Sequence, residues 1–185
     1  NMVFLALVMG AMIAFDMDVP VNKVACFCGV SMISEGIVTV MGPVAVAICI
    51  PPLAMGISTL VSPKKYTRVE KESGKSAILM GLIGITEGAI PFAVADPLRV
   101  IPSIMIGSSI GAAVAAIGKV GDHAPHGGPI VLPVVENRIM FIVAVIIGIA
   151  VTCAILHFWK KDVDEEAATK EGSTSTSDTE IEIEF

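Results

Sequence analysis

The sequence predicts an all-α integral membrane protein, a multi-span helical bundle with broken helices and a re-entrant hairpin. Hydrophobic residues make up 54% of its 185 residues, and the mean hydropathy is +0.82. A soluble domain of this length lacks the charged residues to cover so much apolar surface. The apolar residues also come in runs. Some approach the ~20 residues that cross a bilayer, and others are interrupted by prolines or single charges.

The net charge of −6 belongs to the C-terminal tail. Residues 160–185 contain three lysines and nine acidic residues, whereas residues 1–159 are electrically neutral. The chain therefore has no basic face for nucleic acid, and we exclude nucleic-acid binding. We divide the chain into a membrane-embedded part, residues 1–161, and an acidic tail, residues 162–185, which we expect to be disordered.

The first third of the chain contains apolar runs that are too short for simple spans. Residues 2–15 are apolar, and we expect this run to continue upstream, so that the N-terminal part of the protein precedes this sequence. A polar, proline-containing stretch at 16–23 separates it from a half-length run at 24–34. This stretch is either the break in a broken helix beside a transport site or an ordinary turn outside the membrane. The local sequence leaves both open.

Charged segments divide the second half of the chain. We expect a loop at 63–76, and its five basic residues predict a cytoplasmic position. At the end of the last apolar run, Trp159, Lys160 and Lys161 would anchor the chain at the cytoplasmic surface. An even number of crossings must lie between these two points, so one segment must enter and leave on the same side. The three apolar segments are residues 77–95, 101–118 and 139–158.

The segment at 77–95 is the best candidate for a re-entrant hairpin, because Glu87 and Pro91 interrupt it. Non-helical backbone at membrane depth persists only inside protein or beside a water-filled cavity. An acid in an apolar run costs roughly 2.5–3.5 kcal/mol to insert, so it usually serves a function. The alternative is an ion pair of Glu87 with Arg99 or Lys119 that holds helices together.

No metal or cofactor site is predicted. The two histidines at 123 and 126 flank Ala124 and Pro125 in a turn and lack the spacing of helical metal ligands. All four cysteines lie in apolar runs, and we expect them to be small buried hydrophobes. Asp96 and Arg99 stand three residues apart, so a local ion pair is as plausible there as contact with a substrate.

Three motifs follow one another along the chain. FDM at 15–17 precedes PVNK at 20–23, GITEGAIPF at 84–92 precedes ADPLRVIPS, and APHGG lies at 124–128. Together they resemble the motifs of the fructose-type enzyme IIC permeases of the bacterial phosphoenolpyruvate-dependent sugar phosphotransferase system. The chain departs from that pattern at Asp18 and Val19, where the family usually has two glycines.

The resemblance implies that this chain is the C-terminal part of the IIC domain of a bacterial inner-membrane permease, with a cytoplasmic C-terminus. Such a permease carries a sugar, fructose or a related one. It phosphorylates that sugar from a phosphocysteine on an enzyme IIB domain, which an upstream IIA and HPr relay supplies. The resemblance also implies a homodimer in the lipid membrane and no cofactor. We expect this chain to be inactive by itself.

The resemblance assigns roles to individual residues as well. Glu87 would be catalytic, accepting the proton of the sugar hydroxyl and aligning its oxygen for in-line attack. Arg99 or His126 would meet the charge of the incoming phosphoryl group. The expected substrate-binding residues are Asn22, Thr86, Asp96, Arg99 and His126.

A second class of function fits the residues alone equally well. An ion-coupled secondary transporter without group transfer would also need broken helices and an acid within the membrane. A cytosolic B-type domain encoded upstream would decide against it. A membrane anchor without transport would explain the spans, but not the glycine-rich, proline-broken surroundings of Glu87.

Overall fold

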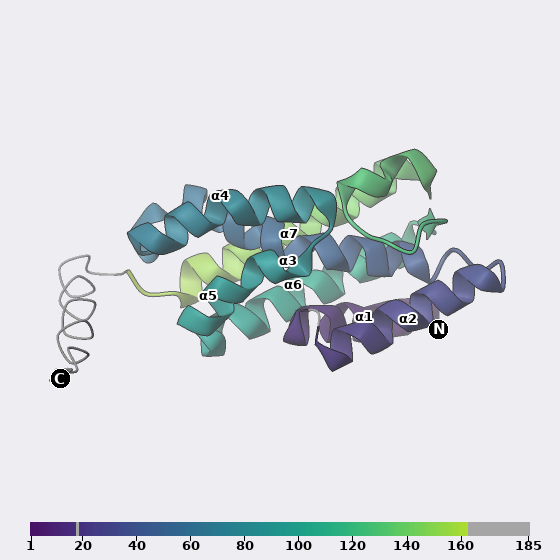
Figure 1. Ribbon diagram of the computed structural model, residues 1–185, viewed down its shortest axis with the longest axis horizontal. Coiled ribbons are helices and arrows are strands. Elements are labelled where there is room, and N and C mark those ends of the chain that lie inside the picture. Colours follow the sequence, from purple (N-terminus) through teal and green to yellow (C-terminus); the bar gives the residue numbers. More distant parts are fainter. Residues whose placement is uncertain (18, 163–185) are drawn as a thin grey trace, which may run out of the picture.

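In the computed structural model of the chain, the helices run lengthwise in one bundle (Figure 1). The structure describes residues 1–17 and 19–162, so the tail expected to be disordered lies, from residue 163 on, outside the described residues. Within the described residues three helices are long and apolar enough to cross a membrane, which confirms the prediction of an all-α membrane protein. They are α3 (Met41–Val61), α6 (Pro97–Ile117) and α7 (Arg138–Trp159).

The helix α3 forms the centre of the bundle. Most of its residues are buried, because α1, α4, α6 and α7 all pack against it. Pro51 and Pro52 lie inside this helix. Neither has an N–H, so the carbonyls of Ala47 and Ile48 receive no helical hydrogen bond from them. By contrast, α6 and α7 leave broad apolar faces uncovered, the kind of surface that lipid contacts.

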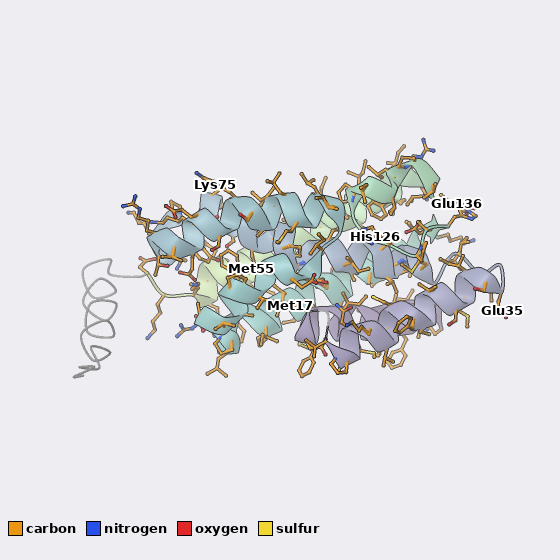
Figure 2. The ribbon with its side chains drawn as sticks, viewed as in Figure 1. Met17, Glu35, Met55, Lys75, His126 and Glu136 are labelled. Atoms are coloured by element: carbon orange, nitrogen blue, oxygen red, sulfur yellow. The ribbon has the colours of Figure 1, made fainter. Side chains whose placement is uncertain are left out.

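The helices α1 (Met2–Asp16) and α2 (Pro20–Ser34) lie side by side (Figure 1). Met17 ends α1 with a φ of 47°, and Figure 2 places it between the two ends of the bundle. The carboxylate of Asp16 accepts hydrogen bonds from the N–H groups of Val21 (2.8 Å) and Asn22 (2.9 Å), which caps the first turn of α2. Because the end of α1 at Met17 lies between the two ends of the bundle, the geometry favours a break beside a transport site over an ordinary turn outside the membrane.

The loop expected at 63–76 is much shorter in the structure. Only a short 3₁₀ turn, η1 (Pro63–Lys65), and two further residues precede α4 (Arg68–Ile83). The side chain of Thr67 accepts a hydrogen bond from the N–H of Glu70 (3.2 Å), and the Glu70 carboxylate accepts one from the N–H of Thr67 (2.8 Å). This capping box starts a helix inside the charged stretch, so the extent of the predicted loop was wrong.

The predicted hairpin is present, and it turns at Gly84. Gly84 ends α4 with a φ of 86°, a conformation that glycine adopts without strain. The chain returns through η2 (Thr86–Ala89) and α5 (Ile90–Ala95). Pro91 lies in the first turn of α5, where a missing N–H costs no helical hydrogen bond. We call α4, η2 and α5 together the hairpin.

The hairpin enters and leaves at one end of the bundle. Thr67 before α4, Ala95 at the end of α5 and Lys160 after α7 all line one pocket there. The last apolar run therefore ends where the hairpin begins, as the even number of crossings requires. Figure 2 shows Lys75 toward this end and Glu35 and Glu136 at the other.

The opposite end is closed by the connection between α6 and α7. It contains the short antiparallel strands β1 (Gly121–Asp122) and β2 (Val135–Glu136) and the 3₁₀ segment η3 (Pro129–Val134). The N–H of Asp122 donates to the carbonyl of Val38 (3.1 Å), which attaches this connection to the turn before α3. The polar motif at 124–128 therefore begins two residues after this hydrogen bond to Val38, and it extends from there to the hairpin turn.

Candidate functional site

Three sequence motifs that lie far apart in the chain meet at one pocket of about 290 Å³. The hairpin turn, the start of α2 and the segment 124–128 each contribute to its wall, and α3 supplies the rest. The residues that line it are Asn22, Cys26, Met41, Ile48, Gly84, Ile85, Thr86, Glu87, Pro125 and His126. Four of the six residues predicted for the site are therefore brought together here.

Glycines allow the hairpin turn and the segment 124–128 to touch. A Cβ on Gly84 would collide with the carbonyl oxygen of Gly127, and a Cβ on Gly128 would lie 2.8 Å from the Cα of Gly84. The N–H of Gly128 also donates to the carbonyl of Ala45 in α3 (3.1 Å). Backbone contacts of this kind fix the turn against α3 without using any polar side chain of the pocket.

His126 is held beside the hairpin turn. Its Nε2 lies 2.6 Å from the carbonyl oxygen of Ile83, so the ring donates its Nε2–H to the end of α4. The side chain is otherwise exposed. The histidine can therefore turn its second ring nitrogen toward a ligand while the first one fixes its position.

Glu87 and Thr86 present polar groups to the pocket from η2. The Thr86 side chain is buried and that of Glu87 is half-buried. Across residues 1–17 and 19–162, neither side chain makes a hydrogen bond or an ion pair. Of the two alternative partners of Glu87, Arg99 pairs instead with Asp96 at 3.0 Å, and no ion pair joins Lys119 to Glu87 among the described residues. An unpaired carboxylate in so apolar a chain is expected to meet a ligand.

Asn22 lines the pocket, yet its side chain also holds the break between α1 and α2. Its Nδ2 donates to the carbonyl of Ile13 (2.8 Å), and its Oδ1 accepts from the thiol of Cys26 (3.3 Å). The residue is only 2% exposed. The two hydrogen bonds of its amide group therefore help to place α2 beside the pocket.

Asp96 and Arg99 lie in a different place. Their ion pair, 3.0 Å long, lines a second pocket of about 420 Å³ at the open end of the hairpin. This second pocket shares no residue with the one that contains Glu87. Of the two roles left open for Asp96 and Arg99, the local ion pair is the one formed in the structure.

Sequence reasoning missed two charged residues in the second pocket. Glu70 and Lys160 are both buried and form an ion pair of 2.7 Å. The spacing of Thr67 and Glu70 could have revealed the start of a helix. Nothing local marks Lys160, which was expected to anchor α7 at the membrane surface and is instead enclosed by protein. That expectation was wrong for Lys160, while the neighbouring Lys161 is exposed.

The cysteines are less uniform than expected. Cys49 is buried in α3, Cys26 and Cys153 are partly buried, and Cys28 is exposed on α2, which the expectation of four buried cysteines did not foresee. All four are free thiols. In the part of the chain that the structure describes, no group of three His, Cys, Asp or Glu side chains could hold a metal ion.

Comparisons with known proteins point to one family. The chain is 47% identical to the fructose-like permease IIC component 2 of Escherichia coli, over all of this chain and 50% of that protein. It is 43% identical to the PTS system fructose-specific EIIC component of Haloferax volcanii, over 88% of this chain and 44% of that protein. It is 35% identical to the PTS system fructose-specific EIIABC component of Bacillus subtilis, over 90% of this chain and 26% of that protein. No family profile and no solved structure matches the chain.

These similarities extend over all or most of the chain. The chain spans about half the length of the first two relatives. Its three long apolar helices agree with a multi-pass membrane protein. The chain is therefore a homologue of the fructose-type enzyme IIC permeases of the phosphotransferase system, and it corresponds to about half of such a permease.

Proposed function

We propose that the protein containing this chain is a sugar permease that phosphorylates its sugar during transport. The observation that carries the proposal is the unpaired carboxylate of Glu87, which lines a pocket at the hairpin turn. The relatives' names, which specify fructose-type IIC components, support the same function. The pocket volume of about 290 Å³ is near the lower end for small-molecule sites, which suits a single sugar unit.

In the proposed reaction, a sugar hydroxyl attacks the phosphorus of a phosphocysteine on an enzyme IIB domain. Glu87 accepts the hydroxyl proton as the new O–P bond forms. The S–P bond breaks, and its electron pair leaves with the cysteine sulfur as a thiolate. Positioning and charge stabilisation dominate such transfers, so the fixed hairpin turn matters as much as the carboxylate.

The other residues of the pocket would bind and orient the reactants. The Thr86 hydroxyl can donate to or accept from a sugar hydroxyl, and Asn22 shapes the wall beside it. His126 offers a ring nitrogen to the sugar or to a phosphoryl oxygen. Contact of Asp96 and Arg99 with substrate stays a prediction, since their ion pair lies in the other pocket.

The partners follow from the same proposal. Relatives named EIIABC and EIIB'BC components support an enzyme IIB domain as the phosphoryl donor. The IIA and HPr relay and a homodimeric state are implied by the family resemblance. An ion-coupled transporter is not favoured, because the relatives' names all specify phosphotransferase-type or permease IIC components.

Transport in inverted or right-side-out vesicles separates the two mechanisms. The full-length permease would be supplied with a purified phosphodonor relay and labelled fructose, with mannitol and mannose in parallel. We expect uptake only when the relay is phosphorylated, and we expect the labelled product to be sugar phosphate. Accumulation of free sugar that collapses with an ionophore and ignores the relay would favour the ion-coupled alternative.

We further propose that the end of the bundle with the hairpin's open end and Lys160 faces the cytoplasm. Five basic residues near the start of α4 support this orientation through the positive-inside rule. Single cysteines at Arg68 and Glu136, introduced after replacement of the native cysteines, test it with an impermeant reagent on intact cells. We expect position 136 to react from outside and position 68 only after permeabilisation; the reverse pattern would overturn the orientation.

A further inference from the structure

Among the ion pairs of the described residues, the one between Lys160, directly after α7, and Glu70 of α4 is the most buried. The Nζ of Lys160 lies 2.7 Å from the Oε1 of Glu70, and the two side chains are 5% and 9% exposed. Removing two charges from water is costly, and such a pair persists only where the geometry is good and the remaining polar atoms are satisfied. The groups around this pair therefore determine how much it contributes to stability.

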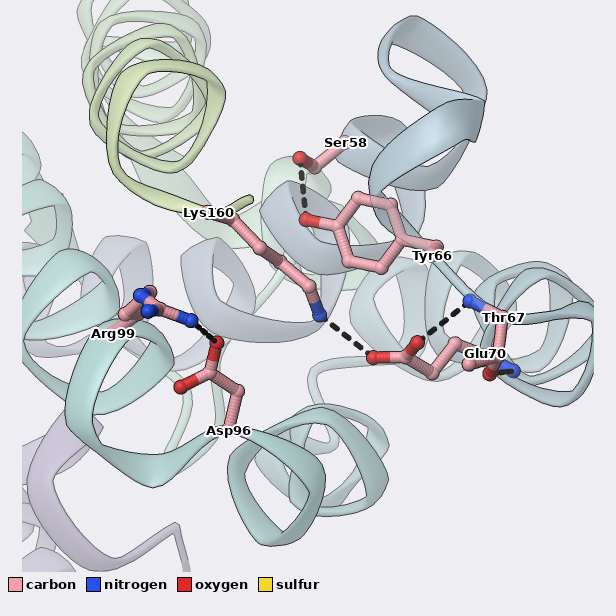
Figure 3. Close-up of polar contacts among 7 residues, drawn as sticks. All are labelled: Ser58, Tyr66, Thr67, Glu70, Asp96, Arg99 and Lys160. Carbon is pink, nitrogen blue, oxygen red and sulfur yellow. Dashed lines mark hydrogen bonds and ion pairs between the residues drawn. The ribbon is translucent and has the colours of Figure 1, made fainter. Parts of the chain in front are cut away.

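Both charges have further partners. The second carboxylate oxygen of Glu70 accepts the N–H of Thr67 at 2.8 Å. The Nζ of Lys160 lies over the ring of Tyr66, 4.2 Å from its centroid, in a cation–π contact. Tyr66 is 1% exposed, and its hydroxyl is 2.7 Å from that of Ser58 in α3. The pair is thus part of a connected polar cluster (Figure 3).

This cluster contacts both arms of the hairpin. Glu70 belongs to the first turn of α4, the outgoing arm. The Tyr66 ring meets Phe92 of α5, the returning arm, edge to face with 6.1 Å between centroids. Phe92 is fully buried. Through Glu70 and Tyr66, the single side chain of Lys160 therefore holds both arms against the end of α7.

The end of α7 is itself fixed. The Nζ of Lys65 donates to the backbone carbonyl of Lys160, and the Ser62 hydroxyl lies 2.8 Å from Nδ1 of His157. Lys160 therefore reaches Glu70 from a backbone that is held at two points. The next residue, Lys161, is exposed, so the burial of Lys160 is specific to that position.

We propose that Glu70, Tyr66 and Lys160 form a clamp that positions the hairpin and thereby the turn with Glu87. None of these three residues lines the pocket at the turn, so they act through the two arms. Loss of the Lys160 charge releases α4 and α5 from α7 at the open end. The turn then opens more often, although no residue of the pocket around Glu87 has been replaced.

Hydrogen–deuterium exchange of the full-length permease in nanodiscs tests the clamp. Lys160→Met keeps the packing of the stem and removes the charge, while Glu70→Gln with Lys160→Met removes both charges and leaves no buried ion unpaired. Lys161→Met is the matched control, and Lys160→Arg keeps the charge. The exchange of residues 84–89 is compared with that of residues 138–159 in α7.

We expect exchange at 84–89 to rise at least about tenfold in the double variant, and in Lys160→Met if it folds. Residues 138–159 should exchange as in the wild type, and Lys161→Met and Lys160→Arg should resemble the wild type throughout. Unchanged exchange at 84–89 in the folded double variant would overturn the clamp. The link to Glu87 chemistry rests on the proposed function, but this readout does not. A permease that phosphorylates no sugar would refute the function and leave the clamp to be judged by exchange alone.

Discussion

At its turn the hairpin presents an unpaired carboxylate, Glu87, to a pocket, whereas at its open end the acids and bases are paired with one another. Glu70 pairs with Lys160 and Asp96 with Arg99 (Figure 3). Both ends contain charges in an apolar chain, so composition does not separate them. The two ends differ in whether the charged side chains have partners. A paired charge contributes to structure, and an unpaired one is available to a ligand.

The strongest test of this comparison is Glu87→Gln in the full-length permease. Glutamine is nearly isosteric and can accept a hydrogen bond, but it cannot take up the hydroxyl proton. Loss of a general base typically lowers the rate ~10²–10⁴-fold, and we expect that loss in relay-dependent sugar phosphorylation. The amount of folded protein should stay normal, because no cation is left unpaired. Glu72→Gln, an exposed acid of α4, is the control.

Two other results would contradict the contrast between the unpaired Glu87 at the turn and the paired charges at the open end. Near-normal phosphorylation by folded Glu87→Gln would show that Glu87 has no catalytic role. Loss of folded protein, measured by size-exclusion chromatography in detergent, would show that its charge is structural after all. In that case the carboxylate would have a partner in another conformation or in the rest of the permease.

Gly84→Ala tests whether the turn depends on close backbone approach. Alanine at a positive φ costs roughly 1–2 kcal/mol, and its Cβ would also collide with the Gly127 carbonyl, which adds about 1–3 kcal/mol of overpacking. Gly36→Ala is a matched control, because Gly36 also has a positive φ (79°) but nothing within 4 Å of a Cβ. Thermal unfolding should show a clearly larger loss for Gly84→Ala. Equal losses would mean that the contact with Gly127 contributes nothing.

Much of the fold was predictable because membrane spans have a strong local pattern. The run predicted at 139–158 corresponds to α7 (Arg138–Trp159) within one residue at each end. The hairpin was predicted from parity and from the acid at position 87, since both depend only on the order of apolar and charged segments. The position of the turn was not predicted. Pro91 was expected to interrupt the apolar run and instead lies in the first turn of α5, because a proline that starts a helix and a proline that breaks one look alike in sequence.

The site was predictable only in part. The resemblance to known motifs indicated Asn22, Thr86, Glu87 and His126, and the structure places these four around one pocket. The Glu70–Lys160 pair could not be foreseen, because its members are 90 residues apart and no local pattern records such a contact. A lysine after an apolar span is typical of a surface anchor, and only the packing around Tyr66 shows otherwise.

Arg99→Gln sharpens the comparison at the paired end. Arg99 and Asp96 are partly exposed, and ion pairs of that kind contribute about 0.2–1 kcal/mol. We therefore expect phosphorylation to fall by less than about tenfold, with Asp96→Asn/Arg99→Gln resembling the single variant. The measurement is the rate of relay-dependent fructose phosphorylation at saturating sugar. A loss as large as that of Glu87→Gln would show that Arg99 meets the substrate or the phosphoryl group.

The smallest expected effect concerns Asp122, a buried acid whose carboxylate is only partly hydrogen-bonded. One carboxylate oxygen accepts the N–H of Ala124 (2.9 Å), and the other has no partner among the described residues. Burial raises the pKa of Asp122 from 3.8 to about 6, although the Ala124 bond and the nearby His123 and His126 act in the opposite direction. The folded protein thus binds this proton more tightly than the unfolded chain does. The contribution of Asp122 to stability is largest below pH 4 and falls as the pH rises to about 6.

Asp122→Asn should remove this part of the pH dependence, because the amide keeps an oxygen for Ala124 and cannot ionise. The measurement is the thermal unfolding midpoint of the purified permease at pH 5 and pH 7. We expect the drop between the two pH values to be smaller in Asp122→Asn than in the wild type. Asp162→Asn, an exposed acid at the other end of the bundle, should leave the drop unchanged. An equal drop in Asp122→Asn would mean that burial does not raise the pKa of Asp122 in the folded protein.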